Sequence, residues 1–189
     1  MRKSQALMIT AIVAVVVIAV GVFLVKKPVS QSDVAFLEKY GLSGLSVEDI
    51  VHKLDSTTSD PSGLSASITS DYLVLMDDSN EVRLTLPKDK FYISFAPYVT
   101  QSHPCGTHSL SSCQGELVNK EIHAVITDSE GKEIVNSDLT TMANGFVGIW
   151  LPRNMNGTVS VSYNGLVAKA PITTFAGSDT CLTTPLQLN

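Results

Sequence analysis

The chain has 189 residues, among them 13 Lys and Arg, 18 Asp and Glu, and three Cys. Without Arg2, Lys3, Lys26 and Lys27 of its N-terminal segment, nine basic residues remain against all 18 acidic ones, a net formal charge of −9. This charge disfavours nucleic acid and anionic lipid as ligands and suits either a cationic ligand or ordinary solubility, and no glycine-rich phosphate loop indicates a nucleotide-binding enzyme.

The N-terminus predicts a membrane-spanning helix. Residues 6–25 are apolar except for Thr10. At about 1.5 Å rise per residue, this run matches the ~30 Å hydrocarbon thickness of a bilayer. We expect residues 1–27 to be a membrane anchor or, alternatively, a secretory signal segment that is removed. Both alternatives export residues 28–189, so we expect an extracytoplasmic protein of the cell envelope, tethered by residues 6–25 if the anchor is kept.

A small helical unit and a linker are expected over residues 28–63. Ser32 can cap a first helix from Asp33 to Tyr40, because its hydroxyl can accept a hydrogen bond from a free N–H of the first turn. Gly41 is positioned to end this helix, since glycine readily adopts the left-handed conformation that follows many helices.

A second helix is expected from Ser46 to about Leu54. Ser46 and Asp49 give a capping-box signature at its start. The stretch Asp55–Gly63 is rich in Ser, Thr, Asp, Pro and Gly, which is typical of a linker. Because the two helices hold few apolar residues, we expect them to pack on the rest of the chain or on a second copy of themselves.

Residues 64–189 are expected to form a β-rich domain. Apolar and polar residues alternate there in about eight short segments, and Asn164-Gly165 is the strongest hairpin signal. The predicted fold class is therefore α+β, mainly β, with an antiparallel β-sandwich-like domain after the membrane helix and the small helical unit. The predicted strands are residues 67–76, 81–86, 91–95, 122–126, 134–135, 145–151, 158–163 and 166–173. The aromatic residues expected in its core are Phe91, Phe95, Phe146 and Trp150.

The cysteines and two histidines form the candidate site. Three thiols cannot all pair, so Cys105, Cys113 and Cys181 leave one sulfur free unless another molecule or a metal takes it. His103 and His108 bracket Cys105, so a folded loop could place two sulfurs and one or two ring nitrogens around one point. The distant Cys181 would add a third sulfur if the C-terminal tail lies alongside. Thiolate and imidazole together select Cu(I), Zn(II) or similar ions.

A disulfide that staples the loop is the open alternative. Outside the cytosol nearby thiols normally oxidise, and Cys105–Cys113 or a bond from either to Cys181 are all compatible with the sequence. The spacing of eight positions between Cys105 and Cys113 is typical of neither a zinc knuckle nor a thioredoxin-like site. A staple does not require flanking histidines, however.

Other polar and sulfur-containing side chains have weaker signals. Glu116 could orient His108 as a hydrogen-bond acceptor, or it could be solvated. Met142 and Met155 are candidate thioether ligands, although gap-filling in the core is the favoured interpretation for both.

Three motifs resemble those of the CueP family of periplasmic copper-resistance proteins. They are the cysteine segment 105–117, the segment 145–155 that contains the single tryptophan, and the tail segment 179–184. They occur in the same order, and the similarity runs from about Tyr40 to the C-terminus. The departure is the apolar N-terminus, because the family resemblance implies a protein that diffuses freely in a periplasm, whereas this chain is expected to be tethered.

The resemblance implies a copper-binding protein whose three cysteines, Cys105, Cys113 and Cys181, are both the metal ligands and the redox centre, with His108 and His103 in support. It implies that copper is sequestered and passed to an acceptor protein, and that the helical unit mediates a homodimer. Two thiols can also reduce two Cu(II) ions as they close to a disulfide, so Cu(II) reductase activity is a hypothesis. The alternatives are an exported thiol oxidoreductase acting on protein disulfides and an interaction module stapled by its cysteines.

Overall fold

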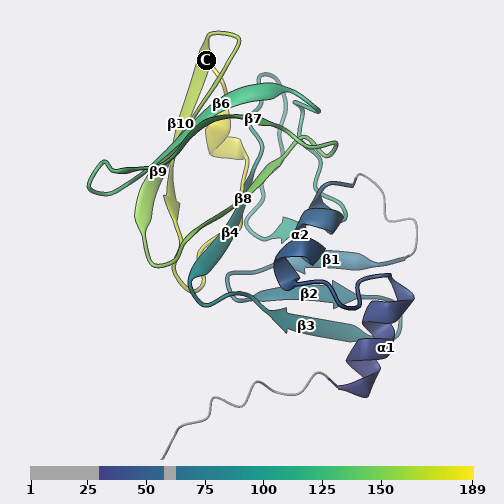
Figure 1. Ribbon diagram of the computed structural model, residues 1–189. Helices are drawn as coiled ribbons and strands as arrows, with labels where there is room; N and C mark the ends of the chain where they lie inside the picture. Colours follow the sequence, from purple (N-terminus) through teal and green to yellow (C-terminus); the bar gives the residue numbers. More distant parts are fainter. Residues whose placement is uncertain (1–29, 58–62) are drawn as a thin grey trace, which may run out of the picture.

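The computed structural model describes residues 30–57 and 63–189, which form two α-helices, one 3-10 turn and eleven short strands (Figure 1). This confirms a mainly β, α+β protein. The helices are α1 (Gln31–Lys39), α2 (Val47–Asp55) and the 3-10 turn η1 (Thr184–Leu186). The strands are β1 (Ser65–Ile68), β2 (Tyr72–Met76), β3 (Glu81–Thr85), β4 (Lys90–Phe95), β5 (His108–Ser109), β6 (Glu121–Asp128), β7 (Glu133–Thr140), β8 (Val147–Pro152), β9 (Asn156–Tyr163), β10 (Leu166–Thr173) and β11 (Cys181–Leu182).

The predicted membrane segment, residues 6–25, lies outside the described residues. Among the residues that the structure describes, no helix is both long and apolar enough to span a bilayer.

Helix α1 begins two residues earlier than the sequence predicts. Ser30, not Ser32, is the N-cap: its hydroxyl accepts from the backbone N–H of Asp33 at 3.1 Å, and the Asp33 carboxylate accepts from the Ser30 N–H at 3.2 Å. This reciprocal pair satisfies two free N–H groups, whereas Ser32 has no matching acidic residue in the right position. Gly41, with φ of 64°, follows the helix end as expected.

Helix α2 confirms its predicted cap but runs one residue further. The Ser46 hydroxyl accepts from the Asp49 N–H at 3.1 Å. The helix includes Asp55, which the sequence analysis assigned to the linker, and the side chain of Asp55 is completely buried. The polar composition of the following residues concealed this burial.

The first sheet has the order β3-β2-β1-β5 and is covered by both helices. The predicted strand 67–76 is divided between β1 and β2, because the hydroxyl of Thr69 accepts from the backbone N–H groups of Asp71 and Tyr72 and folds the chain into a turn. Strand β5 pairs with β1 and sets His108 opposite Ile68. Helices and sheet share a core of Phe36, Leu42, Ile50, Val51, Ala66, Ile68, Leu73 and Leu75.

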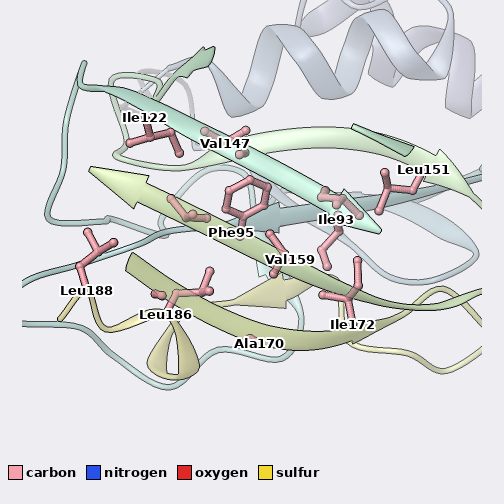
Figure 2. Packing of buried hydrophobic residues seen from close by; sticks show 14 of the residues in the cluster. Ile93, Phe95, Ile122, Val147, Leu151, Val159, Ala170, Ile172, Leu186 and Leu188 are labelled. Atoms are coloured by element: carbon pink, nitrogen blue, oxygen red, sulfur yellow. The ribbon is translucent and has the colours of Figure 1, made fainter. Parts of the chain in front are cut away.

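The other two sheets have the orders β10-β9-β6-β7 and β11-β4-β8 and share a second core (Figure 2). The predicted hairpin at Asn164-Gly165 is confirmed, with positive φ at both residues, as the tight turn between β9 and β10 requires. Phe91 and Phe95 are fully buried in this core, as expected. The side chains that fill it include Ile93, Ile122, Val147, Leu151, Val159, Ala170, Ile172, Leu186 and Leu188.

One strand pair differs from the antiparallel expectation. Strand β11 runs parallel to β4, with Cys181 opposite Ser94. Its two residues are too few to produce a periodic pattern, so the sequence could not indicate it. The carbonyl of Gly106 accepts from the N–H groups of Thr180 (2.8 Å) and Cys181 (3.1 Å), which ties the C-terminal tail to the cysteine loop.

Beside this loop, two glycines allow two backbone segments to touch. The Gly115 N–H donates to the Asn144 carbonyl at 2.6 Å, and a Cβ on Gly145 would lie 2.8 Å from the Gly115 Cα. Gly145 also has φ of 79°, which side-chain-bearing residues rarely adopt.

We predict that Gly145→Ala destabilises the fold by roughly 1–3 kcal/mol more than Gly131→Ala, because only Gly145 combines a positive φ with a close backbone neighbour. Gly131 is the matched control, with φ of 82° and no atom within 4 Å of an added Cβ. Urea unfolding of both variants measures the difference. Equal destabilisation would contradict the role of this close approach.

Candidate metal centre

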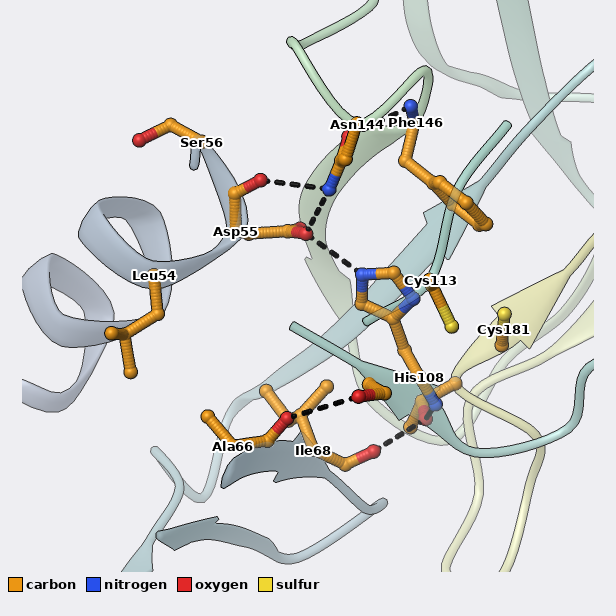
Figure 3. Close-up of polar contacts among 12 residues, drawn as sticks. Leu54, Asp55, Ser56, Ala66, Ile68, His108, Cys113, Asn144, Phe146 and Cys181 are labelled. Atoms are coloured by element: carbon orange, nitrogen blue, oxygen red, sulfur yellow. Dashed lines mark hydrogen bonds and ion pairs between the residues drawn. The ribbon is translucent and has the colours of Figure 1, made fainter. Parts of the chain in front are cut away.

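Four side chains from the cysteine loop and the tail converge on one point, and Figure 3 labels three of them, His108, Cys113 and Cys181. Cys105, His108, Cys113 and Cys181 each offer one donor atom, and these four atoms all lie within 4.8 Å of one another. Strand β5 supplies His108, the turn after it supplies Cys113, and β11 supplies Cys181. His103 lies outside this group, with its half-buried ring 6.4 Å from that of Phe146, centroid to centroid, so its role as a ligand stays a prediction.

Two of the three sulfurs are bonded in the structure. Cys105 and Cys181 form a disulfide, and Cys113 is a free, half-buried thiol. The Sγ of Cys113 lies 3.7 Å from the Sγ of Cys105. Of the pairings that the sequence left open, the structure therefore contains Cys105–Cys181, and the third sulfur stays within van der Waals reach of that bond.

The sulfurs sit against an apolar wall. Ala96 and Phe146, both buried, pack with Cys181, and the partly buried Met142 packs against the same group. Such a wall limits the access of water and strengthens electrostatic interactions within the site. Met142 is thus close to the cysteines, while its role as a thioether ligand stays a prediction.

Both the backbone and the side chain of His108 make polar contacts that hold the residue in place. Its backbone N–H donates to the Thr180 hydroxyl at 3.0 Å, and its ring nitrogen Nε2 lies 2.8 Å from Oδ1 of Asp55. The ring is completely buried and packs against Phe146 at 4.8 Å between centroids. The other ring nitrogen, Nδ1, is turned toward the sulfurs of Cys113 and Cys181 and has no hydrogen-bond partner within ordinary limits (Figure 3).

Asp55 is the residue of this site that the sequence analysis missed. Its Oδ2 accepts from the hydroxyl of Tyr92 at 2.5 Å, and its Oδ1 accepts from Nδ2 of Asn144 at 2.9 Å as well as facing His108. The sequence suggested Glu116 as the acceptor for His108. Its carboxylate instead accepts hydrogen bonds from the backbone N–H groups of Val99 and Thr100. The feature that marks Asp55 as part of the site is its burial at the end of a helix, and the sequence gives no indication of that burial.

The buried pair shifts the pKa of both His108 and Cys113. Burial alone would lower the pKa of His108, but the carboxylate of Asp55 and the neighbouring Cys113 outweigh it and raise the pKa to about 9. Partial burial alone would raise the pKa of Cys113, but the adjacent His108 outweighs it, so the net shift is downward. The imidazolium of His108 therefore increases the fraction of Cys113 that is thiolate, the form in which a cysteine reacts and binds metal.

The fold and the site together define a class, a β-rich protein with clustered thiols and one imidazole suited to a soft metal ion. A family model described as periplasmic copper-binding protein CueP matches residues 49–187. The crystal structure of S.CueP is similar, with 50% sequence identity, a TM-score of 0.81, and coverage of 85% of this chain and 99% of that chain. No curated protein sequence matches. The chain belongs to the CueP family of periplasmic copper-binding proteins, which supports an extracytoplasmic location.

We predict that His108→Gln slows alkylation of Cys113 by iodoacetamide at pH 7, roughly tenfold for each unit by which the thiol pKa rises. The reason is loss of the imidazolium that stabilises the thiolate. The rate difference should shrink as the pH rises through about 9, where His108 loses its proton. His123→Gln is the control, because the side chain of His123 on β6 is exposed and pairs with Asp138. Equal rates for His108→Gln and the unmodified protein would contradict the thiolate–imidazolium pair.

Proposed function

We propose that the reduced protein binds Cu(I) through Cys105, Cys113, Cys181 and the Nδ1 of His108, and so sequesters copper outside the cytoplasm. The observation that carries this proposal is the convergence of the four donor atoms within 4.8 Å. Thiolates and imidazole are the donors that Cu(I) prefers, and coordination protects sulfurs that would otherwise oxidise. The Nδ1 of His108 supports the same role, since it makes no geometrically regular hydrogen bond and its electrostatic partner is the sulfur of Cys113.

We further propose that the site reduces Cu(II). The thiols of Cys105 and Cys181 give up two electrons and two protons and close to a disulfide, while two Cu(II) ions each take one electron and become Cu(I). Cys113 and His108 then keep a thiolate and an imidazole for one of the Cu(I) ions. The Cys105–Cys181 bond beside a free Cys113 is the arrangement that this reaction would leave.

The remaining parts of the hypothesis stay predictions. These are support from His103, a tether formed by residues 6–25, a division between residues 28–63 and 64–189, a homodimer through the helical unit, and an acceptor protein that takes the copper. The two helices share their core with the first sheet, so any dimer contact would use the outer surface of this unit, where Val34 of α1 and Leu45 of the connection between the helices are exposed.

One observation favours a second candidate function, thiol oxidoreductase activity on protein disulfides. Cys113 has a lowered pKa, and its sulfur lies 3.7 Å from Cys105 of the disulfide. Its thiolate could attack Cys105, forming a Cys105–Cys113 bond and releasing the thiolate of Cys181 without any external oxidant. Turnover of a disulfide substrate by metal-free protein would favour this candidate over copper binding.

For copper binding, we predict that Cys113→Ser weakens Cu(I) binding more than about tenfold, or 1.4 kcal/mol. The reduced protein is titrated with Cu(I) under anaerobic conditions against a competing chelator. His123→Gln is the control, because its imidazole pairs with Asp138 at 2.7 Å on the exposed side of another sheet. Unchanged affinity in a variant with all three cysteines replaced by serine would refute the proposal.

For copper reduction, we predict that the fully reduced protein converts two Cu(II) to two Cu(I) and loses two of its three thiols. Thiol counting and mass-spectrometric mapping after the reaction should find Cys105 bonded to Cys181 and Cys113 free. A mixture dominated by another pairing, or Cu(II) left unreduced, would contradict the reaction as written.

A further inference from the structure

We propose that Asp55, the last residue of helix α2, is a positioning residue of the copper centre. Its carboxylate accepts a hydrogen bond from Nε2–H of His108 and thereby orients Nδ1 toward the copper ion. This inference rests on the proposed function. Asp55 is then a fifth residue of the site, beside the four donor residues, and it makes helix α2, which supplies none of the donors, part of the metal centre.

The hydrogen bond to Asp55 fixes the orientation of the His108 imidazole. In a neutral ring one nitrogen carries the proton and the other offers a lone pair. The carboxylate of Asp55, 2.8 Å from Nε2, can only accept, so when copper displaces one proton of the imidazolium the other proton stays on Nε2 and the lone pair lies on Nδ1. Turning the ring over would set a carbon against Asp55 and a carbon against the sulfurs. The contact of the ring with Phe146 at 4.8 Å also opposes such a rotation.

Two further hydrogen bonds hold the carboxylate of Asp55 in place. Tyr92 on β4 donates to Oδ2, and Asn144, from the turn before β8, donates to Oδ1. Nδ2 of Asn144 also donates to the backbone carbonyl of Asp55 at 2.8 Å, which fixes the helix end itself. A Cβ on Gly148 would lie 2.7 Å from Oδ2, so only glycine leaves room for the carboxylate.

A carboxylate beside a histidine, as in the Asp55–His108 pair, is a common arrangement at metal sites. A histidine that binds a metal commonly donates its second N–H to a carboxylate or carbonyl, which fixes the ring and makes the ligating nitrogen more basic. All parts of this arrangement are buried: Asp55 and His108 have no exposed surface. The buried acceptor lies on one side of the ring, and on the other side Nδ1 makes no regular hydrogen bond and faces the cluster of sulfurs, which points to a metal ion shared by Nδ1 and those sulfurs.

The direct test uses the unmodified, reduced protein labelled with nitrogen-15 in histidine. NMR spectra recorded with and without Cu(I) report which ring nitrogen carries the proton and which contacts the metal. We expect the proton on Nε2 in the Cu(I) form and a metal-induced shift at Nδ1 of His108. Metal at Nε2, or no change at His108 when copper binds, would overturn the inference.

The second test uses Asp55→Asn, which keeps the shape of the side chain and removes its charge. We expect Cu(I) affinity to fall about 10- to 100-fold, as is typical when the hydrogen-bond partner of a metal-ligating histidine is changed. Asp138→Asn is the matched control, because it makes the same change in an exposed aspartate–histidine pair on another sheet, where Oδ1 of Asp138 lies 2.7 Å from Nδ1 of His123. Its affinity should stay close to that of the unmodified protein.

A double-mutant comparison separates positioning from a merely structural role. If Asp55 acts through His108, Asp55→Asn should cause no further loss of affinity in a His108→Gln background. A full additional loss there, or normal affinity of Asp55→Asn alone, would refute the inference. If Asp55→Asn does not fold, the NMR test on the unmodified protein decides. Normal Cu(I) binding without any cysteine would instead refute the proposed function, so the two failures are distinguishable.

Discussion

The buried carboxylate of Asp55 is the contact on which the geometry of the site depends. It receives hydrogen bonds from β4, from the turn before β8 and from the ring of His108, and so joins helix α2 to three parts of the β structure. A buried charge is tolerated only when such partners surround it, and removing one member of a buried ionic pair typically costs about 3–5 kcal/mol. The same contacts that hold α2 in place thus hold the imidazole at the sulfurs.

The sulfurs reach the imidazole by a separate route. The tail returns along β4 as the parallel strand β11, and the Gly106 carbonyl binds two successive N–H groups of that tail. Cys181 therefore lies against the loop of Cys105 and Cys113, although 76 residues separate it from Cys105. Binding and electron transfer can use the same sulfurs because the disulfide and the free thiol lie side by side. The nearby imidazolium lowers the pKa of that thiol and so makes it more reactive.

Local signals predicted most of the elements, because they depend on neighbouring residues. The Ser46 cap and the Asn164-Gly165 turn are examples, and the soft donors of the site were recognisable by residue type. Asp55 was assigned to the linker since its partners Tyr92, His108 and Asn144 are 37, 53 and 89 residues away, and no local pattern reports such contacts. The disulfide pairing was open for the same reason: three pairings are equivalent until the position of the tail is known. The two-residue strands β5 and β11 are too short to show periodicity.

The account is tested most directly by anomalous diffraction at the copper absorption edge from crystals of the reduced protein loaded with Cu(I) under anaerobic conditions. It predicts one copper ion bonded to the Nδ1 of His108 and to sulfur atoms that include Cys113, with Asp55 still hydrogen-bonded to Nε2. Copper bound at another place on the chain, or at the sulfurs while Nδ1 of His108 stays unligated, would contradict it.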